Sequence, residues 1–211
     1  MKFVTWWPEP VIDSLPTVRE GGPLNPPALG PRAPVLHTSA RRAGAARWLH
    51  ARLFEILGGW VTTVAEPEAK IALATQSSHH GWHAGLWGER LPTLHGVDPA
   101  TWVRPASAGV EEAVAALAAA PTTVERLAAL HRCLLPRLAA AHADHLERAS
   151  AVADAPTIRT LGLVLADLNH DQRAGERLLQ RLLTDPADVR RAAGRQAELE
   201  CILVAAGPLL T

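Results

Sequence analysis

The segment EPEAKIALATQSSHHGWHAGLWGERLP, residues 66–92, decides the predicted fold. An α-helix turns by about 100° per residue, so side chains three, four and seven positions apart share one face. One face of this segment mixes apolar and polar side chains: Leu73, Gln76, His80, His83, Ala84, Trp87 and Leu91. Pro67 suits the first turn of a helix, and Pro92 ends one at the preceding residue. The segment therefore predicts a helix that buries imidazoles together with apolar groups.

The rest of the chain also reads as helices, because strand signals are almost absent. Periodicity and capping residues predict helices over residues 38–60, 107–120, 122–149, from 154 onwards, and from 185 to just before 207. Thr122 and Glu125 have the spacing of a capping box, and Pro136 predicts a kink in the helix that they begin. We expect an all-α protein, with four long antiparallel helices in a bundle and an extra C-terminal helix.

Residues 1–36 are rich in proline and glycine, which excludes a long helix and predicts an extended arm. Trp6 and Trp7 give this arm apolar surface to bury, so we expect it to pack on the bundle. The remaining residues, 37–211, have a length that suits one helical domain.

The composition of the chain excludes several classes of protein. The formal net charge is +0 and the pI is about 7.2, which gives no electrostatic reason to bind nucleic acid or an anionic membrane. The chain has neither a signal-peptide pattern nor the run of about eighteen apolar residues that a membrane span needs. We therefore expect a cytoplasmic protein whose two cysteines, Cys133 and Cys201, are reduced. The frequent Ala, Arg, Pro and Gly are typical of a GC-rich bacterial genome.

A second group of inward histidines lies on the predicted helix over residues 122–149. Its apolar face carries Leu127, His131, Leu134, Leu138, His142 and His145. Buried imidazoles need partners, which are each other, a carboxylate, a metal or a substrate. One buried histidine is more often a hydrogen-bonded core residue, but pairs three positions apart on two helices favour a shared polar site. His50, on the first helix, lies only near the boundary of the inward face.

On the helix that follows residue 154, the helical geometry selects one inward acid. Asp171 and Gln172 fall on its apolar stripe, and Gly175 leaves room beside Asp171. Asp167 and His170 fall on its polar face. We therefore expect substitutions of Asp167 or His170 to matter less than substitution of Asp171.

Three stretches of the chain resemble the ferritin-like superfamily. They are FEILGGW (residues 54–60), the segment over residues 66–92 and DAPTIRTLGLVLADLNHD (residues 154–171). The resemblance covers roughly residues 40–180 and implies a helical bundle with a metal site between its helices. Members that hold two irons use one Glu from each of two helices and Glu-x-x-His from each of the other two.

This chain departs from that set of ligands. His83 matches the histidine of the second-helix motif, but His80 stands in place of the acid. In the fourth helix, Leu168 and Asp171 stand where the motif has its acid and its histidine. The resemblance therefore implies a histidine-dominated site for iron, otherwise copper or zinc, and not a standard carboxylate-bridged di-iron centre.

These residues favour a metal-dependent oxidase or oxygenase that acts on a small molecule, as in a biosynthetic pathway. We predict metal ligands at His80, His83, His142 and Asp171, catalytic roles for His83, His145 and Asp171, and a substrate pocket of Gln76, Trp87, His131 and Gln172. Two alternatives stay open. One is a metal-free isomerase, cyclase or lyase whose general base is a His–Asp pair, either His83 or His145 with Asp171, and the other is a non-catalytic binding protein. The expected partner is a small-molecule substrate, and the sequence allows a homodimer.

Overall fold

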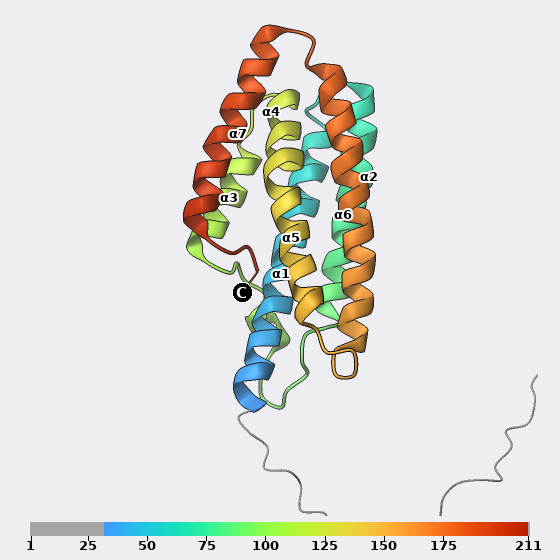
Figure 1. The fold of residues 1–211 in the computed structure, drawn as a ribbon, viewed down its shortest axis with the longest axis vertical. Helices are drawn as coiled ribbons and strands as arrows, with labels where there is room; N and C mark the ends of the chain where they lie inside the picture. Colours follow the sequence, from blue (N-terminus) through green and yellow to red (C-terminus); the bar gives the residue numbers. More distant parts are fainter. Residues whose placement is uncertain (1–31, 211) are drawn as a thin grey trace, which may run out of the picture. The chain divides into compact units, whose positions relative to one another are not determined.

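The computed structural model describes residues 32–210 of the chain, and every regular element in that range is a helix (Figure 1). The elements are α1 (Arg32–Val61), α2 (Pro67–Gly88), η1 (Pro99–Trp102), α3 (Ala108–Ala118), α4 (Thr123–Ala128), η2 (Ala129–Leu134), α5 (Leu135–Arg148), α6 (Ala155–Leu182) and α7 (Pro186–Ala206). The predicted all-α class is confirmed, and the extra C-terminal helix is α7. None of the described helices combines the length and the apolar character that a bilayer crossing requires.

Helix α1 begins earlier than predicted. Residues 32–36, which we expected to belong to the extended arm, form its first turns. Pro34 fits there because the first four N–H groups of a helix have no intrahelical acceptor. The rest of the expected arm, residues 1–31, lies outside the described residues.

Local sequence signals set several of the helix starts. The Thr122 hydroxyl accepts a hydrogen bond from the Glu125 N–H at 3.4 Å, as the predicted capping box requires. The Ser107 hydroxyl accepts from the Val110 N–H at the start of α3. Proline occupies the first turn of α2, α6 and α7, where its missing N–H costs nothing.

The helix predicted over residues 122–149 is interrupted by the π-helical segment η2, residues 129–134. Pro136 has no N–H to donate, and its ring clashes with the carbonyl group four residues earlier, at Arg132. A wider turn before the proline relieves this conflict. The expected irregularity at Pro136 therefore takes the form of a π turn, which places His131 inside it.

The long helices are not all antiparallel. The Thr123 hydroxyl donates to the Glu66 carboxylate at 2.7 Å, so α2 and α4 start side by side and run in the same direction. Arg181 near the end of α6 pairs with Glu68 at 2.6 Å, so α6 runs opposite to both (Figure 1). The prediction of four antiparallel helices was wrong here, because residues 89–122, with α3 among them, return the chain to the starting end of α2. Helix α7 packs on α3, α4 and η2.

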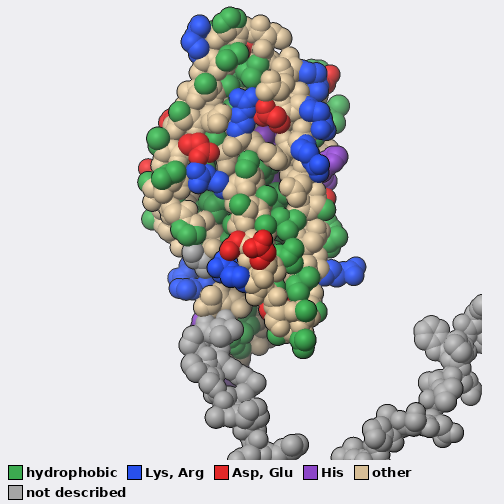
Figure 2. All heavy atoms as spheres, viewed as in Figure 1, with side chains coloured by type: hydrophobic (Ala, Val, Ile, Leu, Met, Phe, Trp, Pro, Cys, Tyr) green, Lys and Arg blue, Asp and Glu red, His purple; other side chains and the backbone are tan. Residues whose placement is uncertain are grey.

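The core is apolar at both ends and polar in its middle. Leucines such as Leu49, Leu53 and Leu57 of α1 are fully buried. The buried polar side chains are His50, Gln76, Ser77, His80, His83, His131, His142, Thr160 and Asp171. Outside, basic and acidic side chains are interspersed on the face drawn in Figure 2, in keeping with the zero net charge. The unusual chemistry of this protein is therefore internal.

Candidate metal centre

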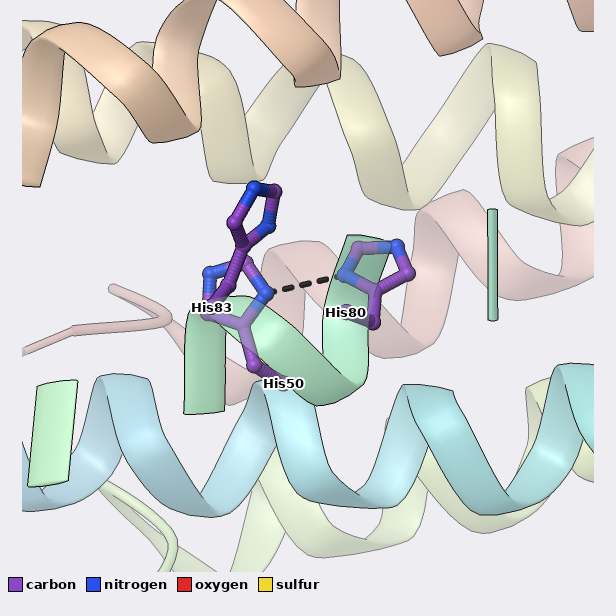
Figure 3. A group of neighbouring side chains, drawn as sticks. All are labelled: His50, His80 and His83. Atoms are coloured by element: carbon purple, nitrogen blue, oxygen red, sulfur yellow. Dashed lines mark hydrogen bonds between the residues drawn. The ribbon is translucent and has the colours of Figure 1, made fainter. Parts of the chain in front are cut away.

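Three buried imidazoles meet between α1 and α2, namely His50, His80 and His83, which we call the inner triad (Figure 3). One ring nitrogen from each lies within 4.8 Å of the other two. The Nδ1 atoms of His50 and His80 are 2.8 Å apart, so one ring donates a hydrogen bond and the other accepts it. Three nitrogen ligands at this spacing, shielded from water, can hold a metal ion.

The neighbouring side chains explain why the inner triad forms. His80 and His83 lie one turn apart on the buried face of α2. The Ser77 hydroxyl donates to the carbonyl oxygen of Phe54 at 2.9 Å, which fixes α2 against α1 one turn away from His50. The antiparallel α1 and α2 thereby bring His50 level with His80.

Sequence reasoning missed His50 as a member of the site. We had placed it near the boundary of the inward face, but its side chain is fully buried. The signal was present, because Leu53 and Leu57 follow His50 at the three- and seven-residue spacing of one helical face, and both are buried. Because Leu49 is apolar, the pattern placed the centre of the inward face at Leu49 and left His50 at its edge.

The second nitrogen of His83 determines its tautomer. His83 Nε2 lies 2.9 Å from a carboxylate oxygen of Asp167, so this nitrogen carries the proton and donates it. His83 Nδ1 is then an unprotonated acceptor; it is buried and has no hydrogen-bond partner among the described residues. Within the same part of the chain, His80 Nε2 is likewise buried and without a partner. Unpartnered nitrogens are costly in a core, and a bound ion would give them a partner.

Burial keeps these imidazoles neutral. Desolvation, reinforced by the neighbouring histidines, lowers the pKa of His50 and His80 well below 6.5. Desolvation also lowers the pKa of His83, against the opposing effect of Asp167. Metals bind the neutral form of histidine, so the inner triad is already in the required protonation state near neutral pH.

His142, a predicted ligand, lies beside the inner triad and outside it. Its Nε2 is 3.2 Å from His50 Nε2, and the indole of Trp87 stacks on its ring with centroids 5.3 Å apart. Burial lowers the pKa of His142 to about 3. His142 and Trp87 therefore pack beside the inner triad, and His142 orients the ring of His50.

Asp171 and Asp167 have different partners from those we expected. Asp171 is buried as predicted, but its carboxylate accepts a hydrogen bond from Nδ1 of His79 at 2.8 Å, so the predicted set of His80, His83 and Asp171 is not assembled. Asp167, expected on the polar face, reaches across to His83 instead. Asp167 lies at the edge of the buried face of α6, so its partly exposed side chain can contact α2. His170 is exposed, as predicted.

His145 is also apart from Asp171. Its ring stacks against Trp87 with centroids 6.0 Å apart, and it lines a cavity of about 350 Å³ together with Arg42, Arg148 and Asp154. Burial and the Arg42 charge lower the pKa of His145 to about 4. Asp171 accepts from His79, and the structure assigns no hydrogen bond between Asp171 and His145 among the described residues.

The predicted pocket residues are dispersed around the inner triad. Gln76 is buried, and its amide donates to the backbone oxygen of Asp171 at 3.4 Å, while its own oxygen has no partner within residues 32–210. His131 is buried, both of its ring nitrogens are unpartnered in that range, and burial lowers its pKa to about 4. The space at Gly175 is filled by His131, since a Cβ there would lie 2.1 Å from His131 Nε2. Gln172 is half-buried on α6.

Comparison with known proteins assigns no family or function to this chain. No family model, no curated protein and no solved structure matches the chain. The proposed function therefore rests on the inner triad and its surroundings alone.

Proposed function

We propose that this protein binds one first-row transition-metal ion through His50, His80 and His83. The observation that carries the proposal is the convergence of three buried imidazoles within 4.8 Å. Imidazole ligands suit zinc, copper, nickel or a single iron, and not magnesium or calcium. Three protein ligands leave a position open, and an ion held in this way supplies Lewis-acid or redox chemistry to a further ligand.

We extend this proposal to a metal-dependent oxidoreductase acting on a small molecule. It is supported by the burial of the inner triad, because a site closed to bulk water protects reactive species from side reactions. Neighbouring side chains also hold the imidazoles in place: Asp167 orients His83, and His142 orients His50. Iron or copper as the native ion would fit a redox role, whereas zinc would point to Lewis-acid chemistry.

The arrangement of the helices supports a ferritin-like fold as part of the proposal. Helices α2 and α4–α5 run parallel and are joined by a long connection, while α1 and α6 run opposite to them (Figure 1). One long crossover of this kind is the topology of ferritin-like bundles. The inner triad would occupy the interior position where such bundles hold metal.

A second candidate function is metal-free acid–base catalysis. It is favoured by the two hydrogen-bonded His–Asp pairs, His83–Asp167 and His79–Asp171. A carboxylate that orients a histidine is the arrangement used by general bases. In this alternative the protein would be isolated without metal and would still require Asp167.

Element analysis of protein purified without a metal-binding tag separates the two functions. The proposal predicts about one equivalent of iron, copper, nickel or zinc, which is lost in His50→Ala and in His80→Ala. His170→Ala is the matched control, because His170 is exposed and outside the inner triad. Metal-free protein that also fails to bind added Zn²⁺ or Cu²⁺ in calorimetry would exclude the metal-binding function.

A further inference from the structure

A second cluster of histidine and aspartate side chains lies at the contact between α2 and α6, and it shares His83 with the inner triad. His79 and His83 are four residues apart on α2, and Asp167 and Asp171 are four residues apart on α6. Two hydrogen bonds join them: His79 Nδ1 to Asp171 at 2.8 Å, and His83 Nε2 to Asp167 at 2.9 Å. We call these the interface pairs. Two helices that run in opposite directions thus present two imidazoles to two carboxylates.

The interface pairs lie between the solvent and the inner triad. The side chains of His79 and Asp167 are each 29% exposed, whereas that of Asp171 is 4% exposed. The side chain of His83, which belongs to both groups, is fully buried. An ion in solution can therefore reach the outer members of this cluster without any opening of the bundle.

The charges of the interface pairs are not balanced by fixed cations. Asp167 and Asp171 lie one turn apart on α6, so two carboxylates are neighbours at this contact. In the part of the chain that the structure describes, neither carboxylate pairs with an arginine or a lysine. A divalent cation would supply the missing charge.

We propose that His79, Asp167 and Asp171 form a second, outer metal site for a divalent ion such as Mn²⁺, Fe²⁺ or Zn²⁺. Two carboxylates and one imidazole suit harder ions than the all-nitrogen inner triad does. Asp167 uses one oxygen to accept from His83, so its other oxygen is free to bind the ion. An ion that releases the proton between His79 Nδ1 and Asp171 to solvent would contact both side chains, because these two atoms are 2.8 Å apart. Asp167, which is half-exposed, is the member that has to move.

This outer site goes beyond the proposed function and does not depend on it, since it shares no ligand atom with the inner triad. The two sites are nevertheless coupled, because Asp167 orients His83. An ion at the outer site would pull Asp167 and so change how firmly the Nδ1 atom of His83 is presented inward. Metal ions in solution would thus affect the inner triad through the outer site.

The test is the stoichiometry of Zn²⁺ in equilibrium dialysis of the full-length, tag-free, metal-stripped protein. The wild type should bind two ions. Asp171→Asn and His50→Ala should each bind one, and the double variant none. Asp171→Asn keeps an oxygen that accepts from His79, so far-UV circular dichroism should stay unchanged. Asp144→Asn is the control, because Asp144 is an exposed carboxylate that pairs with Arg148 on the outside of α5.

A Mn²⁺ titration followed by electron paramagnetic resonance gives a second readout. The free Mn²⁺ signal should fall with wild type and with His50→Ala, and at least tenfold more ion should be needed with Asp171→Asn. If the wild type binds one Zn²⁺ that is lost in His50→Ala and kept in Asp171→Asn, the outer site is refuted and the proposed function stands. One ion lost only in Asp171→Asn refutes the inner site alone. If no ion binds, both proposals fail.

Discussion

Helix α2 contributes to two regions of contrasting chemistry, the inner triad and the interface pairs. In the inner triad imidazoles face imidazoles, all buried and all held neutral by desolvation. At the interface pairs the imidazoles face carboxylates, with two of the four side chains partly in water. His79 and His80 are consecutive, yet a rotation of about 100° sends one to each region. A single turn of helix therefore contributes to two clusters with different chemistry.

His83 belongs to both regions, so its substitution should have the largest effect on Zn²⁺ binding. His83→Ala removes one nitrogen of the inner triad and leaves Asp167 without its partner. The affinity for Zn²⁺ should fall by more than the roughly 10–100-fold that is lost when a side chain that only orients a ligand is removed. Isothermal titration calorimetry measures it, with His170→Ala as the exposed control. Equal losses in both variants would mean that the inner triad is not the binding site.

Acid should destabilise the interior because its histidines are buried in the neutral form. The pKa of His131 is lowered from 6.5 to about 4 in the folded protein. Between these values the unfolded chain binds more protons, so this contribution is complete above pH 6.5 and is lost as the pH falls towards 4. One such group is worth about 3 kcal/mol at 1.36 kcal/mol per unit.

The pH prediction is checked by urea unfolding at several pH values. His131→Gln cannot take up a proton, so its free energy of unfolding should fall by about 3 kcal/mol less than that of the wild type between pH 6.5 and 4. Parallel curves for the two proteins would show that His131 is protonated in the folded state.

Packing should distinguish the interior of α6 from its exposed face. A Cβ at Gly175 would lie 2.1 Å from His131 Nε2, whereas a Cβ at Gly162 has no atom within 4 Å. Gly175→Ala should cost about 2 kcal/mol through overpacking. Gly162→Ala should stabilise by about 0.5–1 kcal/mol, because alanine favours the helix. Thermal melts that rank the two variants in the opposite order would contradict the placement of His131.

The smallest effect is expected at the surface, where charge pairs are solvated. Arg52 and Glu55 form an ion pair on α1, and both side chains are largely exposed. Arg52→Ala should change the free energy of unfolding by less than about 0.5 kcal/mol and leave Zn²⁺ binding unchanged. A large loss in either measurement would show that charge matters outside the interior as well.

Periodicity predicted which side chains leave each helix towards the core. On α2, the predicted face matched the buried side chains of Leu73, Gln76, His80, His83 and Trp87. Pattern alone could not say which residues meet across two helices, because that depends on their rotation and axial offset. Asp171 was correctly placed inside and still met His79 in place of His80. The parallel course of α2 and α4 was missed for the same reason, since it depends on where the long connection leads.

The π turn of residues 129–134 has a consequence for the register of α5. A π turn accommodates one more residue than an α-helical turn does. If the turn became α-helical with all of its residues kept, everything downstream would rotate by about 100° around the helix axis. His142 would then point away from His50, and an alanine neighbour would take its place. The π turn thus absorbs one extra residue between α4 and α5, and it keeps His142 beside the candidate metal centre.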